Sequence, residues 1–142
     1  MAAPVSKFLP RPTPETEFWW ENCRENRLLL QHCSACGSYQ FYPRLACCGC
    51  QNAELEWVEA SGAGIVETCT ICRVPVAEAY ADDLPYVVAI VRLAEGPAMM
   101  SNIIDCDAEA VTTGMPVEVV FEVRNEEITL PQFRPRRGEA GS

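Results

Sequence analysis

Apolar and polar residues alternate with a period of two over most of the chain after residue 53, and Gly, Pro or Asn interrupts each run. This pattern is typical of short β-strands separated by turns. The run YVVAIVRL after Pro85 is almost entirely apolar and is predicted to be a central strand. Pro131 marks the last strand as an edge strand, because proline cannot donate a backbone hydrogen bond. The expected strands cover residues 28–31, 39–42, 55–59, 65–76, 86–93, 98–104, 117–123 and 127–133.

The segments between these strands have the composition of turns rather than of long helices. Gly62 and Gly64 predict a turn or bulge, and Glu95-Gly96-Pro97 predicts a tight hairpin. Residues 77–84 are expected to form a polar loop, and residues 105–113 a short turn or a single helical turn. Five or six strands without intervening helices predict a small barrel, and a five-stranded OB-type barrel fits the length.

One helix is predicted, near the N-terminus. Residues 13–15 (TPE) offer a hydroxyl for the N-cap, a proline at the first helical position and an acid in the first turn. The helix is expected to run to about Glu25, and Asn26 is expected to stop it in the left-handed conformation.

Phe18, Trp19 and Trp20 are three adjacent large aromatic residues on this helix. A helix this short cannot bury all three by itself. They are expected either to pack on the rest of the molecule or to form a docking face for another chain, and both alternatives stay open.

Two cysteine pairs follow the first predicted strand. Cys33 and Cys36 form one CxxC pair, and after ten residues Cys47 and Cys50 form another. Four thiolates from two tight turns make the closed tetrahedral shell of a structural zinc, although the spacer is shorter than usual. Gly37 and Gly49 are expected to supply the unusual backbone angles of the turns. The pattern predicts one structural Zn²⁺ per chain.

The remaining cysteines do not extend this site. Cys69 and Cys72 are expected to lie on opposite faces of a strand, where the two sulfurs cannot bind one ion. Cys48 lies between two ligand positions, so its substitution for one of them stays open as a less favoured alternative. Cys23 and Cys106 are predicted to be buried thiols.

Residues for catalysis are few. His32 is the single histidine and directly precedes Cys33, and no nucleophile accompanies it. The carboxylate pairs Asp82-Asp83 and Asp105-x-Asp107 are expected to be solvated turn residues. The sequence therefore predicts no catalytic residues, and whether the chain takes part in an enzyme is left open.

Composition excludes several classes of protein. The 142 residues carry a formal net charge of −9, which disfavours nucleic-acid binding. The nine cysteines are not spaced as in a secreted disulfide framework, and no signal peptide or long apolar run is visible. A cytoplasmic location with reduced thiols and no membrane contact is expected.

The order of motifs resembles the zinc-ribbon/OB-fold family of acyl-CoA-associated proteins. The resemblance extends from about Thr13 to Pro135 and rests on the helix with FWW followed by RLLLQHCSACG, FYPR, CCGC, LEWVEASGAGIV, DLPYVVAIVRLAEGP, GMPVEVVFE and LPQFRP. Cys48 stands where the family often has proline, Asn26 where it often has glycine, and Tyr42 where it has the first of two prolines.

The resemblance implies a mainly β protein with an N-terminal helix, a rubredoxin-like zinc ribbon and a C-terminal five-stranded OB-fold barrel. Cys33, Cys36, Cys47 and Cys50 correspond to the family's zinc ligands. Members are small subunits without catalytic residues that accompany thiolases or thiolase-like aldolases or hydratases, and a chain of this size is similar to the small subunits of benzoylsuccinyl-CoA thiolases. The implied partner is a thiolase-like catalytic subunit in a hetero-oligomer.

Together these observations divide the chain into an arm and helix at 1–27, a zinc ribbon at 28–53, a barrel at 54–134 and a disordered tail at 135–142. We expect a non-catalytic zinc-binding accessory subunit that stabilises its partner and helps to enclose a CoA thioester as a shared ligand. Arg44 and Arg73 are candidates to contact CoA phosphates, because a guanidinium binds phosphate bidentately, although both are also compatible with ordinary surface arginines.

Two other functions remain as alternatives. Zinc ribbons and OB folds also occur in proteins that bind single-stranded nucleic acid, which would require a basic groove with exposed aromatic residues. A redox or metal-handling role would require a labile, reactive thiol.

Overall fold

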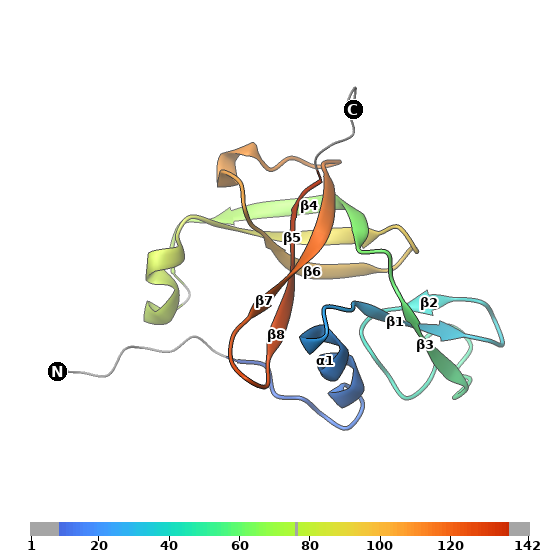
Figure 1. The fold of residues 1–142 in the computed structure, drawn as a ribbon. Coiled ribbons are helices and arrows are strands. Elements are labelled where there is room, and N and C mark those ends of the chain that lie inside the picture. The colour runs from blue at the N-terminus through green and yellow to red at the C-terminus, as the bar shows by residue number, and fades with distance from the viewer. Residues whose placement is uncertain (1–8, 76, 137–142) are drawn as a thin grey trace.

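The computed structural model describes residues 9–75 and 77–136, which form one helix, a three-stranded sheet and a closed five-stranded barrel (Figure 1). Two short 3₁₀ helices, η1 (Glu78–Asp83) and η2 (Ala108–Ala110), interrupt the connections of the barrel. The predicted fold class is confirmed: the protein is mainly β, with an N-terminal helix, a ribbon region and an OB-type barrel. Predictions for residues 1–8, for Val76 and for the tail beyond Arg136 lie outside the described residues.

Helix α1 (Glu17–Arg24) begins later than the sequence predicted. The Thr13 hydroxyl donates to the Glu15 carboxylate (2.6 Å) and does not cap the helix. The Thr13 carbonyl instead accepts from Glu17 N–H (2.8 Å), so residues 13–16 form a turn that leads into the helix. The predicted stop is confirmed, because Asn26 has a φ of +62° and Arg27 N–H donates back to Asn22 O (2.9 Å).

The small sheet consists of β1 (Leu29–Cys33), β2 (Tyr39–Gln40) and β3 (Leu55–Glu59), in the order β2-β1-β3. All pairs are antiparallel, and β3 pairs with β1 from Leu29–Glu59 to Cys33–Leu55. The prediction that residues 55–59 belong to the barrel is wrong, because β3 pairs with β1 in the small sheet. Strand β1 is the central strand and is buried along most of its length. Strand β2 pairs with only two of its residues on one edge, and β3 pairs with all five on the other edge.

The barrel consists of β4 (Ala63–Cys72), β5 (Tyr86–Leu93), β6 (Ala98–Ile103), β7 (Pro116–Val123) and β8 (Thr129–Pro135). Its strand order is β4-β5-β6-β8-β7, and β7 closes the barrel by pairing with β4. Every pair is antiparallel except β6–β8, which is parallel and has one register pair, Ile103–Phe133. This arrangement corresponds to the five-stranded barrel that the alternation and the turn residues predicted.

Pro131 does not lie at the edge of an open sheet, because β8 has neighbours on both sides. Its carbonyl accepts a hydrogen bond from the Ser101 hydroxyl of β6 (3.0 Å), so its backbone faces the sparse β6–β8 pairing. The missing N–H of the proline therefore falls where the barrel has the fewest ladder hydrogen bonds. The prediction that Pro131 marks an edge strand is therefore wrong.

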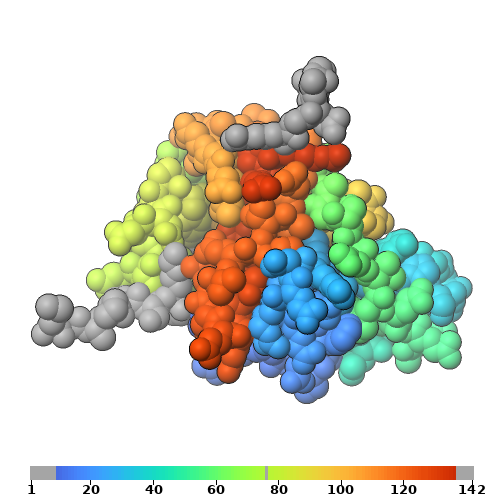
Figure 2. Space-filling model, in the orientation of Figure 1, coloured from blue at the N-terminus to red at the C-terminus, as the bar shows by residue number. Residues whose placement is uncertain are grey.

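A single apolar core joins the helix, the small sheet and the barrel. It contains Trp19 and Cys23 from α1, residues 28–30, and barrel residues such as Val66 and Phe133. The Trp19 indole is 5% exposed and its Nε1–H donates to Leu29 O (3.0 Å). The space-filling view shows this blue N-terminal region filling the angle between the orange C-terminal strands and green β3 (Figure 2). Of the helices in the described part of the chain, none is long and apolar enough to cross a membrane.

Candidate metal centre

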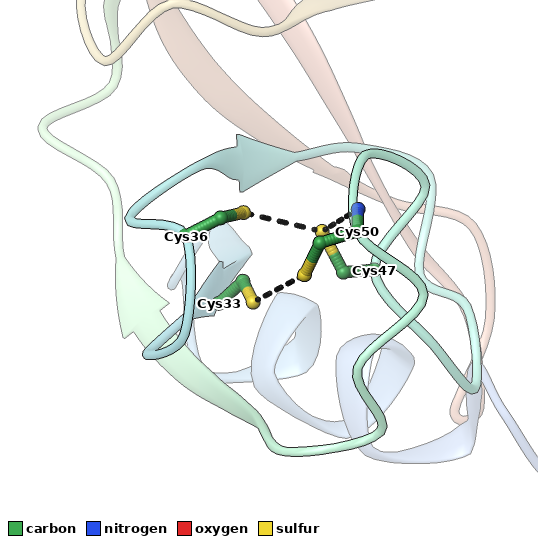
Figure 3. Close-up of side chains that lie close together, drawn as sticks. All are labelled: Cys33, Cys36, Cys47 and Cys50. Carbon is green, nitrogen blue, oxygen red and sulfur yellow. Dashed lines mark hydrogen bonds between the residues drawn. The ribbon is translucent and has the colours of Figure 1, made fainter.

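Two turns of similar geometry carry the four cysteines of the predicted metal site (Figure 3). In the first turn, Cys33 N–H donates to Ser38 O (2.9 Å) and the Cys33 carbonyl accepts from Gly37 N–H (2.8 Å). In the second turn, the same two hydrogen bonds recur around Cys47, from partners at the same spacing, with lengths of 2.9 and 2.8 Å. Each turn therefore presents its two sulfurs from an equivalent backbone frame.

The left-handed residue that each turn requires lies directly after its second cysteine. Gly37 has a φ of +77° in the first turn, as expected, but the equivalent residue in the second turn is Gln51, with a φ of +64°. The expectation that Gly49 supplies this angle is wrong. Gly49 instead directs its N–H at Cys47 Sγ (3.3 Å), within the turn.

The four sulfurs lie within 4.8 Å of one another. The shortest separations cross between the turns: 3.5 Å from Cys33 to Cys50 and 3.6 Å from Cys36 to Cys47. Four thiolates around Zn²⁺ at the usual bond length of ~2.3 Å stand about 3.8 Å apart. The distances and the all-sulfur donor set thus fit a closed structural zinc site.

Hydrogen bonds to two of the sulfurs favour the thiolate form that a metal requires. The backbone N–H groups of Cys50 and Gly49 lower the pKa of the Cys47 thiol. A hydrogen bond between Cys36 Sγ and Ser38 Oγ (3.2 Å) lowers the pKa of Cys36 to about 6. Cys33 and Cys47 are buried, whereas Cys36 and Cys50 are exposed, so one side of the cluster faces solvent.

A buried pair of glutamines supports the loop that leads to the second turn. Gln31 and Gln40 are each 5% exposed, and Gln40 Nε2–H donates to Gln31 Oε1 (2.8 Å). Gln31 also bonds both backbone groups of Arg44, and Gln40 Oε1 accepts from Cys48 N–H (2.9 Å). These amides hold residues 44–48 in place against β1 and β2.

Neither glutamine was among the predicted site residues. Gln31 precedes the first cysteine pair by two residues, and Gln40 lies in the spacer. Their only signal was a polar side chain at a position that the strand pattern places inside the molecule. A buried amide must be hydrogen-bonded, so such a position indicates a side chain that organises a nearby loop.

The other cysteines and His32 lie outside the group of four sulfurs. Cys48 is exposed, and its backbone N–H is bonded to Gln40. Cys23 has 0% exposure, and burial raises its pKa to about 12. Cys69 packs against the barrel core, and His32 Nδ1 lies 2.6 Å from Glu56 Oε1.

The candidate CoA-contact arginines lie on different parts of the molecule. The backbone of Arg44 is bonded to Gln31 beside the ribbon, and its side chain is exposed. Arg73 follows β4 and forms an ion pair with Glu109. A hollow of about 420 Å³ lies between η1 and the barrel, with Tyr86 and Arg124 in its lining, but neither candidate arginine lines it.

The three aromatic residues of α1 have different environments, and the packing alternative holds for Trp19, whereas a docking role stays a prediction. Trp19 belongs to the core. Phe18 is 46% exposed and its ring contacts Trp57 at a centroid distance of 5.5 Å. Trp20 is half-buried, packs edge-on against Trp19 and lines a groove at the junction of helix, ribbon and barrel.

Comparison with known domain families divides the chain near the end of the small sheet. Residues 20–56 match the ChsH2 rubredoxin-like zinc ribbon domain, and residues 57–122 match the ChsH2 C-terminal OB-fold domain. The first match contains all four clustered cysteines. It therefore supports a structural zinc in this region.

Similar proteins include both long and short chains. A DUF35 domain-containing scaffold protein of Methanothermobacter thermautotrophicus is 38% identical over 115 residues, which cover 80% of this chain and 86% of that protein. A probable enoyl-CoA hydratase alpha subunit of Thermomonospora curvata is 34% identical over 128 residues, which cover 89% of this chain. This chain spans only 40% of the length of that subunit.

A solved structure described as Ltp2-ChsH2(DUF35) aldolase has the same fold. It superposes with a TM-score of 0.80 at 33% identity, covering 89% of this chain and 98% of the solved chain. The match therefore includes the helix, the ribbon and the barrel together.

Proposed function

Because the chain belongs to the DUF35 family, whose zinc-ribbon and OB-fold domains it matches over residues 20–122, we propose that it is a zinc-stabilised accessory subunit of an acyl-CoA-processing complex. The observation that carries this proposal is the similarity over 98% of a solved chain described as part of an Ltp2-ChsH2(DUF35) aldolase. The scaffold and hydratase-subunit relatives support the same role.

In this proposal Cys33, Cys36, Cys47 and Cys50 hold one structural Zn²⁺ per chain. The ion contributes no reaction step, since four protein thiolates leave no open position for water or substrate. Its role is to fix two turns of a sheet whose own apolar core is small. The sheet and α1 then form a rigid body against the barrel.

The side chains of the described residues favour a supporting role over a catalytic one. His32 is engaged with Glu56, and the raised pKa of Cys23 makes its buried thiol a weak nucleophile. The catalytic residues of the complex would then belong to the partner subunit.

The partner is proposed to be a thiolase-type subunit or a thiolase-like aldolase or hydratase that acts on a CoA thioester. The similarity to a probable enoyl-CoA hydratase alpha subunit and to an Ltp2-ChsH2(DUF35) aldolase supports the hydratase and aldolase classes. The accessory subunit would help to enclose the thioester, with Arg44 the more available of the two candidate arginines. Arg73 would have to exchange its ion pair with Glu109 for a phosphate.

The charge distribution does not favour single-stranded nucleic acid as a ligand. Four arginines of the barrel region are already paired with glutamates: Arg73–Glu109, Arg92–Glu67, Arg124–Glu122 and Arg134–Glu118. A groove that follows a phosphate backbone requires unpaired basic residues, and the net charge of −9 opposes it further.

Co-expression with the acyl-CoA enzyme subunit encoded beside this chain tests the proposal. We expect one complex in gel filtration that contains both chains, one zinc per accessory chain by elemental analysis, and higher activity of the catalytic subunit in the complex than alone. A catalytic subunit that stays separate and is equally active alone would contradict the accessory role.

The CoA contact is tested by Arg44→Ala in the same complex. We expect KM for the CoA ester to rise about 10-fold with little change in kcat, because the variant loses one charge-assisted hydrogen bond to phosphate. Arg134→Ala is the matched control, because Arg134 is paired with Glu118 on the barrel surface. Equal kinetic constants for both variants would remove Arg44 from the CoA site.

A further inference from the structure

The groove that Trp20 lines is a surface feature that the proposed metal centre does not explain. It has a volume of about 310 Å³ and lies where α1, the loop after β2 and strands β6 and β8 meet. Its walls include Trp20, Phe41, Tyr42, Met99, Met100 and Leu130. We call this site the uncharged groove.

No charged residue contributes to the lining of the uncharged groove. This is unusual for the chain, because 22% of its residues are charged and its net charge is −9. Tyr42 is 51% exposed and Met100 is 57% exposed, so two large side chains of the lining are open to solvent. An exposed apolar hollow with a polar surround is typical of a protein-binding site.

The composition of the walls also favours a protein segment as the occupant. Tryptophan, tyrosine and methionine are enriched at interfaces, and methionine adapts its shape to a partner. The groove lies between the ribbon and the barrel, since Tyr42 lies in the loop after β2 and Met100 lies in β6. A segment seated there would contact both parts of the accessory chain at once.

We infer that the uncharged groove receives an apolar, uncharged segment of the catalytic subunit, an inference that rests on the proposed function. The lining offers no charge for an acidic or basic segment to pair with. A second copy of this chain is disfavoured as the occupant, because two chains that each carry a net charge of −9 repel each other. The catalytic subunit docks through this groove, with Trp20, Tyr42 and Met100 as the main contacts.

Two opposite charges at Met100 test both the place and the chemistry of docking. Affinity for the catalytic subunit encoded beside this chain is measured by calorimetry with the wild type, Met100→Glu and Met100→Lys. We expect both variants to bind at least about 30-fold more weakly, as at an interface hot spot. A basic segment would instead bind the Glu variant more tightly, and an acidic segment the Lys variant, and either result would overturn the inference.

Val123→Glu is the matched control. Val123 is also an exposed apolar strand residue, at 72% exposure, but it does not line the groove. Its affinity should stay within about twofold of the wild type. Tyr42→Asp, in the loop after β2, gives an independent variant if a Met100 variant loses its zinc or its thermal transition.

The remaining outcomes separate this inference from the proposed function. A wild type that binds the catalytic subunit while the Met100 and Tyr42 variants bind equally well overturns the groove but leaves the accessory role. A wild type that forms no complex overturns both. An isolated chain that is a dimer as wild type and a monomer as Met100→Glu would assign the groove to a second copy. A shift of tryptophan emission on deletion of residues 1–8 that is absent in the Trp20→Phe background would assign it to the chain's own N-terminal segment.

Discussion

The three-stranded sheet and the barrel lie in one chain and share one apolar core, yet their interiors differ in kind. Between the strands and turns of the small sheet lie four clustered cysteines and the buried amides of Gln31 and Gln40. The interior of the barrel contains Phe133 and the valines 66, 87, 91 and 117, each at most 1% exposed. The small sheet is therefore organised by polar and metal-binding groups, and the barrel by apolar contacts.

This difference determines what each region requires to fold. Burial of apolar side chains stabilises the barrel without any ligand, because it removes a large apolar area from water. The small sheet has one strand of two residues, and its buried leucines belong to the core that it shares with the barrel rather than to a core of its own. Such a module usually depends on its metal for folding.

Loss of one thiolate is expected to have the largest effect. Cys33→Ser leaves three sulfurs and should remove the zinc and unfold the small sheet, since metal binding supplies about 10–16 kcal/mol to folding in small zinc modules. The barrel strands β4 to β8 should keep their structure. Elemental analysis reports the zinc, and amide hydrogen exchange reports each region separately.

Cys48→Ser is the matched change in the same loop. Cys48 is exposed and lies outside the sulfur cluster, so its variant should retain one zinc per chain. A loss of zinc in Cys48→Ser with retention in one of the four other variants would show that Cys48 is the ligand in its place. Simultaneous unfolding of the barrel in Cys33→Ser would contradict the independence of the two regions.

The sequence predicted those features of both regions that depend on local residues. The spacing of Cys33, Cys36, Cys47 and Cys50 identified the cluster, because two short turns bring each pair together whatever the rest of the chain does. Asn26 predicted the helix stop, and Gly96 marked a hairpin turn in which it has a positive φ. Period-two alternation predicted the barrel strands, because it too is a property of residues close together in the chain.

The features that the sequence missed depend on contacts between distant residues. Alternation in the segment 55–59 shows a strand but carries no information on its partner, so its pairing with β1 was not foreseen. The Gln31–Gln40 pair is recognisable only when two strands are placed side by side. The sequence could not distinguish Trp20 from its two aromatic neighbours, because the groove that Trp20 lines forms only where α1 meets β6 in the fold.

A cavity in the barrel core is expected to have an intermediate effect that spares the metal centre. Phe133 is 0% exposed and lies at the single β6–β8 register pair. Phe133→Ala should lower the free energy of unfolding by about 3–5 kcal/mol, because the neighbours cannot fill the space left by the ring. Chemical denaturation measures this loss.

The zinc content of Phe133→Ala distinguishes the two regions. It should stay at one ion per folded chain, since the apolar core that contains Phe133 includes neither the four clustered cysteines nor the two supporting glutamines. The control Val123→Ala removes an exposed side chain and should change the free energy of unfolding by less than about 0.5 kcal/mol. Zinc loss in folded Phe133→Ala would show that the barrel supports the metal centre directly.

The smallest of these effects is expected for the glutamine pair, and it measures how far the amides rather than the metal organise the ribbon loop. Gln40→Leu keeps the size of the side chain but leaves Cys48 N–H without its bond to Gln40. Loss of a hydrogen bond to such a part-buried group costs about 1 kcal/mol, which should appear as faster zinc release to a chelator while the barrel keeps its stability. Gln132→Leu makes the same change at a barrel residue that is also 5% exposed, and it should leave zinc release unchanged. Equal release rates in Gln40→Leu and the wild type would mean that the metal alone determines the conformation of residues 44–48. The buried amides would then adapt to that conformation and not stabilise it.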